Sequence, residues 1–143
     1  MSKTVQSIID AKGSDVWSID GDATVFEALE FMADKNIGAT IVTHDGALVG
    51  IMSERDYARK IILMSRMSKA TRVSEIMTPD PTCVAPSDTV DNCMQLMTDN
   101  RFRHLPVVDD GDLVGLISIG DVVRAVISEQ QFLIDQLEGY ITG

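Results

Sequence analysis

The order of apolar and polar residues predicts alternating helices and strands. Residues 24–36 place apolar side chains three and four positions apart, as on one face of a helix. These side chains are Val25, Ala28, Leu29 and Met32. Two short β-branched runs follow on either side of Asp45-Gly46, a dipeptide typical of tight turns between strands. With a second helix expected from Glu54 to about Met67, the first half is predicted to form a helix, a hairpin and a helix.

The second half of the chain repeats this pattern at an offset of 65 residues. Residues 24–57 superpose without a gap on residues 89–122, with many more identical pairs than the roughly two expected by chance. The helical spacing recurs at Val90, Cys93, Met94 and Met97. Asp110-Gly111 again marks a turn, and a final helix is expected from Gly120 to about Glu138. Both copies begin their first helix with a Thr, and Thr24 with Glu27 predicts a capping box.

Each copy is expected to form a small β-sheet with two packed helices. An isolated unit of about 60 residues is marginally stable, whereas two copies related by a pseudo-twofold axis can share a core. Short extended segments, residues 15–19 and 81–85, precede the two copies. We therefore predict an α/β fold with the first repeat at 10–67, a polar and basic linker at 68–78, and the second repeat with its C-terminal helix at 79–140.

The densest shared motif ends each predicted hairpin. Residues 50–56 read GIMSERD and residues 115–121 read GLISIGD, so Ser and Asp stand three positions apart where a strand becomes a helix. A helix N-terminus with a hydroxyl can hold a phosphate, and a carboxylate can accept both hydroxyls of a ribose. The same spacing is typical of a helix cap, in which the Asp only satisfies backbone N–H groups. Both interpretations stay open from the motif alone.

Charge and composition narrow the class of partner. The 143 residues carry 12 Lys and Arg against 22 Asp and Glu, a net charge of −10 that disfavours nucleic acids and anionic membranes as partners. Eight of the basic residues nevertheless lie between Arg55 and Arg103, so the middle of the chain is basic. No apolar run is long enough to cross a membrane, and the two cysteines, Cys83 and Cys93, belong to no ligand cluster. A soluble, cytoplasmic protein is expected.

The two copies together resemble a CBS domain pair, also called a Bateman module. The resemblance rests on the repeated helix, hairpin and helix, on LPVVDDGDLVGLIS and on the Gly-x-x-Ser-x-x-Asp ending of each hairpin, and it covers about residues 10–140. SERDYARKII and ISIGDVVRAVISE are similar to segments of stand-alone two-CBS proteins of bacteria and plant organelles. Family members usually bind adenine nucleotides in clefts between the repeats and pair into dimers. The resemblance implies the same here.

The resemblance also implies two nucleotide sites in which no metal is required. Asp56 and Asp121 would hold the ribose hydroxyls. The residues implied for phosphate are Ser53, Arg55, Arg59, Ser118, Arg103 and His104. Those implied for the adenine base are Ser18, Ile19, Ala39, Thr40 and Ile41 in one site and Thr82, Cys83, Val84, Leu105 and Pro106 in the other. Because the basic residues differ between the copies, the sites are expected to be unequal, although the arginines of the first copy could also line a solvated helix face.

We therefore expect a regulatory sensor, not an enzyme, that binds AMP or, alternatively, ADP, ATP or NAD(H). Occupancy would change its conformation and signal through a homodimer to a regulated protein partner. The C-terminal helix offers Val123, Val126, Ile127, Ile134 and Leu137 for the dimer interface. Two alternatives stay open: a ligand-free structural or dimerisation module, and an enzyme that uses Cys83 or hydrolyses the nucleotide. The enzyme is the weaker, because the sequence holds no recurring catalytic constellation and no phosphate-binding glycine loop.

Overall fold

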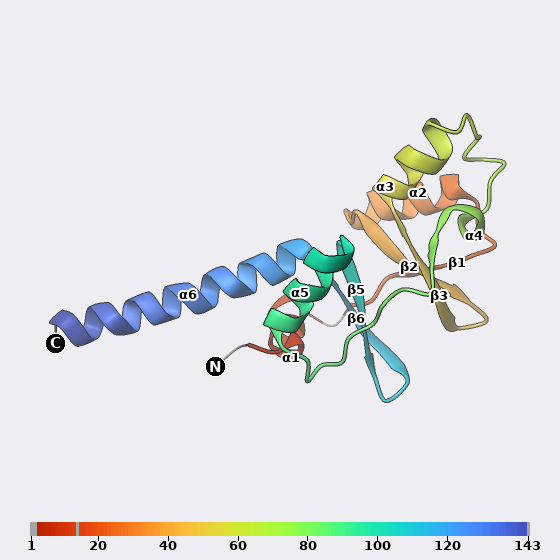
Figure 1. Ribbon diagram of the computed structural model, residues 1–143. Coiled ribbons are helices and arrows are strands. Elements are labelled where there is room, and N and C mark those ends of the chain that lie inside the picture. The colour runs from red at the N-terminus through yellow and green to blue at the C-terminus, as the bar shows by residue number, and fades with distance from the viewer. Residues whose placement is uncertain (1–2, 14, 143) are drawn as a thin grey trace. The chain divides into compact units, whose positions relative to one another are not determined.

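The chain folds into two compact units in the computed structural model, which describes residues 3–13 and 15–142 (Figure 1). The middle unit spans Val16–Thr82. The terminal unit combines the described residues up to Asp15 with those from Cys83 onward. Each unit contains a hairpin and helices, as two α/β copies predict. The division differs from the predicted repeats, because the N-terminal helix packs with the second copy and not with the first.

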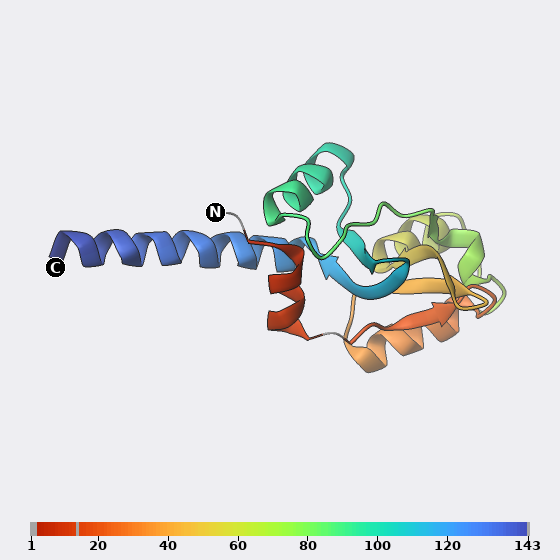
Figure 2. The ribbon, with the colours of Figure 1, turned by 90° about the horizontal axis from the view of Figure 1, so that it is seen from below.

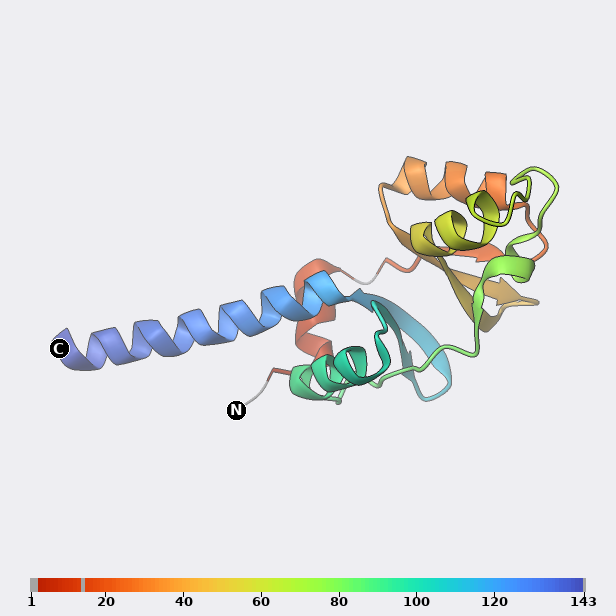
Figure 3. The same cartoon turned by 45° about the horizontal axis from the view of Figure 1, so that its top comes forward.

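The middle unit is built on a four-stranded sheet. Its strands are β1 (Ser18–Asp20), β2 (Ala39–His44), β3 (Ala47–Ser53) and β4 (Thr78–Pro79), in that order across the sheet. β1 pairs with β2 in parallel, and the other neighbours are antiparallel. Its helices are α2 (Val25–Lys35), α3 (Glu54–Tyr57), the π-helix η1 (Ala58–Ile62) and α4 (Val73–Ile76). Figure 3 shows α2 and α3 on the same side of this sheet.

The terminal unit brings the two ends of the chain together. Its elements are α1 (Val5–Lys12), α5 (Val90–Asn100), β5 (His104–Asp109), β6 (Asp112–Ser118) and α6 (Ile119–Thr142). β5 and β6 form an antiparallel hairpin, and Val84 adds an isolated parallel bridge to Val107. In Figure 2, α1 lies beside the beginning of α6. Along the chain, the middle unit is therefore inserted between α1 and the rest of the terminal unit.

The predicted helix starts and turns are confirmed. At the start of α2, the Thr24 hydroxyl accepts a hydrogen bond from the Glu27 N–H at 3.1 Å, and the Glu27 side chain accepts one from the Thr24 N–H. Both hairpin turns have positive φ at their Asp and Gly, 50° and 81° in the first and 50° and 86° in the second. Such turns match the twist of the flanking strands.

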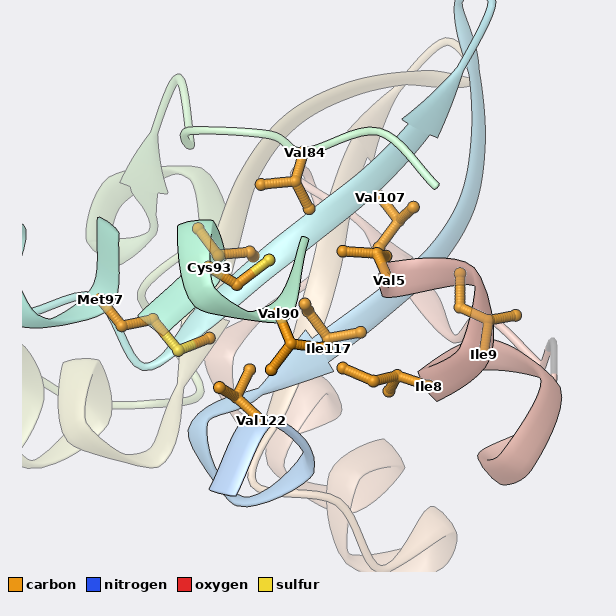
Figure 4. Packing of buried hydrophobic residues seen from close by; sticks show 11 residues of the cluster. Val5, Ile8, Ile9, Val84, Val90, Cys93, Met97, Val107, Ile117 and Val122 are labelled. Atoms are coloured by element: carbon orange, nitrogen blue, oxygen red, sulfur yellow. The ribbon is translucent and has the colours of Figure 1, made fainter. Parts of the chain in front are cut away.

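Each unit has its own hydrophobic core. The buried cluster of the middle unit consists of Val25, Ala28, Met32, Val42, Met52, Ile61, Val73 and Ile76. Figure 4 shows the core of the terminal unit, where α1 contributes Val5, Ile8 and Ile9. These three pack with Val84, Val90, Cys93, Met97, Leu105, Val107, Ile117 and Val122. Cys93, Met32 and Met97 are buried in these cores, as their helical spacing predicted, whereas Met94, at the same spacing, is exposed, and so is Met64.

The segment 68–78, predicted as a polar and basic linker, contributes residues to the core of the middle unit. Val73 and Ile76 of α4 are fully buried in the core of the middle unit, and Thr71 is buried too. The Thr71 carbonyl accepts a hydrogen bond from the Val25 N–H at 2.9 Å, which ties the segment to the start of α2. A one-turn helix with two apolar residues is too short for periodicity to reveal it.

Other element boundaries also differ from prediction. The helix after β3 ends at Ile62 rather than near residue 67, because the chain turns there and Ser65 adopts a left-handed conformation with φ of 56°. The segment 81–85 contributes a single bridge at Val84 instead of a strand. Its first residue is a proline, which cannot donate to a strand ladder.

The motif glycines offer a matched test of packing. A Cβ on Gly50 would lie 2.6 Å from the Met77 sulfur and 2.8 Å from the Thr78 carbonyl oxygen, whereas on Gly115 the nearest atom would be the Ile9 Cδ1 at 3.2 Å. A backbone carbonyl cannot move aside as a side-chain methyl can. We expect Gly50→Ala to lower the free energy of unfolding by about 1–3 kcal/mol and Gly115→Ala by less. Urea denaturation of both variants checks this; equal losses would contradict it.

Candidate functional site

In the middle unit, Ser53 and Asp56 form a helix cap at the end of β3. The Ser53 hydroxyl accepts a hydrogen bond from the Asp56 N–H at 3.1 Å. The Asp56 carboxylate in turn accepts hydrogen bonds from the Ser53 N–H at 3.0 Å and from its hydroxyl at 3.1 Å. The cap that the motif allowed is therefore present. It leaves Asp56 at a strand-to-helix junction with its side chain 13% exposed.

The same cap recurs in the terminal unit. The Ser118 hydroxyl accepts from the Asp121 N–H at 3.2 Å, and the Asp121 carboxylate accepts from the Ser118 N–H at 2.8 Å. The register of each hairpin places the residue that begins the preceding strand opposite this Ser. These pairs are Ala39 with Ser53 and His104 with Ser118. A predicted base residue thus lies opposite a predicted phosphate residue at this end of the first hairpin, and two predicted phosphate residues lie opposite each other at this end of the second.

Cations surround Asp121 on the terminal unit. The Lys12 ammonium lies 2.8 Å from one carboxylate oxygen and the Arg124 guanidinium 2.7 Å from the other. The Asp121 side chain is only 7% exposed. Burial by itself raises the pKa of this carboxyl, but the hydrogen bonds and charge of its donors lower it by more, so the pKa lies below its ordinary value. Asp121 is therefore a carboxylate held by two cations at neutral pH.

Asp56 has weaker partners. The Lys60 ammonium lies 3.5 Å from a carboxylate oxygen, and the Thr78 hydroxyl lies 3.4 Å from the same oxygen. Lys60 also donates to the Ile76 carbonyl at 2.9 Å, so its charge is shared. The two motif aspartates consequently differ in their surroundings, as the unequal basic residues of the copies suggested.

A pocket of about 380 Å³ opens beside Asp121 within the terminal unit. Its polar lining comes from Lys3, which precedes α1, from Ser7 and Lys12 of α1, and from Asp121, Arg124 and Ser128 of α6. Three of these six side chains are cationic, although the chain as a whole carries a net charge of −10. This volume lies at the small end of the range for ligand pockets. A small anion with hydroxyl groups matches this lining, since the cations attract its charge and the carboxylate accepts from its hydroxyls.

Most of the residues predicted to contact a base are buried, but Ser18 is exposed and Ile19 is partly buried. Ser18 and Ile19 pair with Ile41 and Val42 in the parallel β1–β2 ladder, and Thr40 is fully buried. In the terminal unit the Pro106 carbonyl accepts from the Val84 N–H at 2.9 Å, beside the buried Leu105. Thr82 and Cys83 are exposed, and the division between the two units falls between them.

The predicted phosphate residues are distributed less tightly. Arg55 and Arg59 are exposed on α3 and η1, and Arg103 is exposed just before β5. His104 is partly buried at the start of β5. The closest cations to a motif aspartate are instead Lys12 and Arg124. The sequence did not single out Lys12, because it is separated from Asp121 by 109 positions and lies outside the two superposed ranges, residues 24–57 and 89–122.

Two other features concern possible catalysis or metal binding: the Cys83 thiol and a group of two aspartates and a histidine. Burial raises the pKa of the Cys83 thiol above its ordinary value, which disfavours the thiolate that a nucleophilic cysteine needs. Asp20, Asp22 and His44 bring ligand atoms within 4.8 Å of one another on the surface of the middle unit. One Asp22 oxygen lies 3.3 Å from the Arg72 guanidinium, and an Asp20 oxygen accepts from the Asp22 N–H. Both carboxylates of this group therefore have other hydrogen-bonding partners.

Among the helices of the described chain, none is long and apolar enough to cross a membrane. The apolar positions of α6, the longest helix, are interrupted by polar ones throughout its length. This agrees with the sequence, in which no apolar run reaches membrane-spanning length.

Comparison with known proteins gives matches over almost the whole chain. The profile described as "CBS domain" matches residues 8–63 and 73–128. CBS domain-containing protein CBSX3, mitochondrial, from Arabidopsis thaliana is 44% identical over 154 residues, which cover 99% of this chain and 73% of that protein. The crystal structure of the CBS domain NE2398 superposes with a TM-score of 0.84 at 46% identity, covering 89% of this chain and 99% of the other. The crystal structure of CBSX2 in complex with AMP has a TM-score of 0.72 at 28% identity, covering 90% and 98%.

Proposed function

This chain belongs to the CBS-domain family, with two copies in tandem on an α/β fold, and we propose that it is a regulatory module that binds an adenine nucleotide. The family resemblance and the fold class predicted from the sequence are confirmed. The relatives and structures reported above are described as CBS-domain proteins, which supports a sensor rather than an enzyme. AMP is the first ligand to propose, because CBSX2 binds it in a solved structure. ADP, ATP and NAD(H) share the adenosine part and are the next ligands to test.

The observation that carries this proposal is the surroundings of Asp121. An adenine nucleotide brings a vicinal diol and at least one phosphate. The buried carboxylate is an acceptor for the diol, and the Lys12 and Arg124 cations beside it can neutralise the phosphate. For the ribose to bind, its hydroxyls must replace at least one of these cations as donors to the carboxylate. The freed ammonium or guanidinium is then available to the phosphate.

We assign the second proposed site to the matched residues of the middle unit. Asp56 would accept from the ribose, and Ser53, Arg55 and Arg59 would contact the phosphate. The two arginines are exposed and therefore free to reorient toward an anion, at the cost of side-chain entropy. Because Asp56 has only one cation nearby, at 3.5 Å, this site is expected to bind more weakly than the one at Asp121. The base contacts are assigned to the strand residues implied by the family resemblance.

Signalling requires a difference between two states. A ligand shifts a conformational equilibrium only by its unequal affinity for the two conformations. We propose that occupancy of the sites changes the exposed surface of a homodimer and that a regulated protein partner binds one state. We propose the cytoplasm as the compartment, because the sequence has only two cysteines and no long apolar run. The net charge disfavours nucleic acids and membranes as main partners.

A ligand-free structural module is the second candidate, and one observation favours it. Both motif aspartates already accept hydrogen bonds from their own caps, and Asp121 is further paired with two cations. A carboxylate with these partners is stable without a nucleotide. The two candidates differ in what happens when a nucleotide is added.

A thermal-shift series with AMP, ADP, ATP, NAD, NADH and S-adenosylmethionine tests the proposed function. A ligand at about 100 times its Kd stabilises the folded chain by roughly 2.7 kcal/mol, which raises Tm by about 5–10 °C for a protein of this size. We expect such a shift with AMP and at least a part of it with the other adenosine compounds. Adenine-free ribose 5-phosphate serves as the control for general anion binding. Folded protein whose Tm does not change with any nucleotide would favour the structural module.

A further inference from the structure

The ammonium of Lys12 is held beside Asp121 by the packing of the terminal unit. Lys12 is the last residue of α1, and this helix is anchored in the core by its three buried residues. The Lys12 ammonium donates to the Asp121 carboxylate at 2.8 Å and to the Leu116 carbonyl at 2.9 Å. A cation is also favourable at the C-terminal end of a helix. The fold therefore places this charge at the pocket.

The acceptor sites of the Asp121 carboxylate are almost all occupied. Each carboxylate oxygen can accept about two hydrogen bonds. Oδ2 accepts from the Lys12 ammonium and from the Ser118 N–H, both at 2.8 Å, and Oδ1 accepts from the Arg124 guanidinium at 2.7 Å. One acceptor site is left, whereas a ribose diol brings two donors. Because the Ser118 N–H belongs to the helix cap, the diol has to replace a cation.

The two cations differ in how far they can move from the carboxylate. The Arg124 side chain is 73% exposed, so its guanidinium can turn into water. The Lys12 side chain is 38% exposed, and the Leu116 carbonyl of β6 also holds its ammonium. Among the described residues that line the pocket, Asp121 is the only acidic one, against three cationic side chains. An ammonium displaced from Asp121 therefore stays in a cationic pocket and needs another anion.

We propose that Lys12 makes the Asp121 site selective for adenine ligands that carry a phosphate, such as AMP, over adenosine and S-adenosylmethionine. This selection rests on the proposed nucleotide site at Asp121. When the ribose of AMP replaces the ammonium on the carboxylate, the phosphate gives the ammonium a new anionic acceptor. Adenosine occupies the same carboxylate and offers no anion in return. S-adenosylmethionine has a sulfonium where AMP has its phosphate, which adds a cation to a cationic pocket.

The site proposed at Asp56 has a different arrangement. The Lys60 ammonium lies 3.5 Å from the Asp56 carboxylate and has a closer acceptor in the Ile76 carbonyl, at 2.9 Å. A ribose that replaces the longer contact leaves the ammonium with its closer acceptor. Selection for a phosphate is therefore expected to be weaker at Asp56. An Asp56→Ala background removes this site, so that titrations report on the site at Asp121.

Isothermal titration with AMP, adenosine and S-adenosylmethionine in the Asp56→Ala protein tests the role of Lys12. Lys12→Met keeps an unbranched side chain of similar length and removes its charge. We expect this variant to bind AMP about 10-fold or more weakly, because the phosphate loses a cationic donor. It should bind adenosine and S-adenosylmethionine more tightly, because their diol no longer has to displace an ammonium. Changes of opposite sign cannot result from a loss of folded protein.

Two further variants of the Asp56→Ala protein serve as controls. Lys12→Arg keeps a cation at the end of α1 and should retain the preference for AMP over adenosine. Lys69→Met removes a cation from an exposed position of the middle unit, where the ammonium lies 4.8 Å from the centroid of the Phe26 ring. This control should leave both affinities unchanged. Equal losses for AMP and adenosine in Lys12→Met would show that Lys12 only positions α1, and would overturn its role in selection.

The same titrations separate the role of Lys12 from the proposed function. If Lys12→Met binds AMP and adenosine as the Asp56→Ala protein does, the selection by Lys12 is wrong and the nucleotide site is retained. If the Asp56→Ala protein itself binds neither AMP nor adenosine, the proposed site at Asp121 is wrong, and the selection by Lys12 is wrong with it.

Discussion

Ile8→Ala is expected to destabilise the terminal unit by about 2–5 kcal/mol while the middle unit stays folded. Ile8 is almost completely buried, in the cluster that α1 forms with residues of the second copy. α1 is also tied to that copy by its backbone. The Val5 N–H donates to the Asp88 carbonyl at 2.9 Å, and the Val90 N–H donates to the Lys3 carbonyl at 2.8 Å. Loss of this magnitude is a large share of the stability of a small domain.

Hydrogen exchange read by mass spectrometry checks where the loss occurs. Peptides from residues 83–139 are expected to lose protection in Ile8→Ala, and those from residues 16–82 to keep it. Gln6→Ala is the control, since the side chain of this exposed residue of the same helix donates to Asp10 on the surface. Protection lost first in the middle unit would mean that the N-terminal helix stabilises the first copy, as a linear order of repeats would suggest.

Asp121→Ala is expected to weaken AMP binding at the terminal unit by about 100-fold or more. Two hydrogen bonds from ribose hydroxyls to a carboxylate are each worth about 1.5–3 kcal/mol, and a loss of about 3 kcal/mol corresponds to more than a factor of 100. Removing the carboxylate also leaves Lys12 and Arg124 without their shared anion. Isothermal titration with AMP measures the change. Asp56→Ala should remove the weaker site and leave this one.

The helix cap is the complication in that experiment, and two variants resolve it. Asp121→Asn keeps an acceptor for the Ser118 N–H, so the cap is retained while the charge is lost. Asp112→Ala, at the exposed start of β6, controls for removal of an acidic residue from the same unit. We expect Asp121→Asn to fold like the parent protein and still bind AMP poorly. AMP affinity equal to that of the parent in both Asp121 variants would show that this Asp is only a cap.

Local features of this protein were predictable because their causes are local. The capping box of Thr24 and Glu27 depends on groups three residues apart. Each Asp-Gly turn depends on two residues that tolerate positive φ. The Ser-x-x-Asp motif also formed the cap that its spacing allowed. For the same reason the motif could not decide between a cap and a ligand site, because a cap needs no other part of the chain.

Features that depend on distant residues were missed. Val73 and Ile76 looked like part of a basic linker, yet both are fully buried because the chain returns over the sheet there. Lys12 had no feature that distinguished it from other surface lysines. Its ammonium reaches both the Leu116 carbonyl and the Asp121 carboxylate only because α1 packs against the second copy. The cationic lining of the pocket followed from that packing.

The sequence by itself determined the two α/β copies, their hairpins and caps, and the family to which they belong. Hydrophobic periodicity and short-range hydrogen bonding depend on residues only a few positions apart, so both can be recognised in the sequence. Only the tertiary structure decided which copy the N-terminal helix completes and which cations stand beside Asp121. Burial of Val5 and Ile8 selects that packing, since apolar side chains gain by leaving water wherever a complementary core exists. Such a gain depends on shape in three dimensions, which the order of residues along the chain does not display.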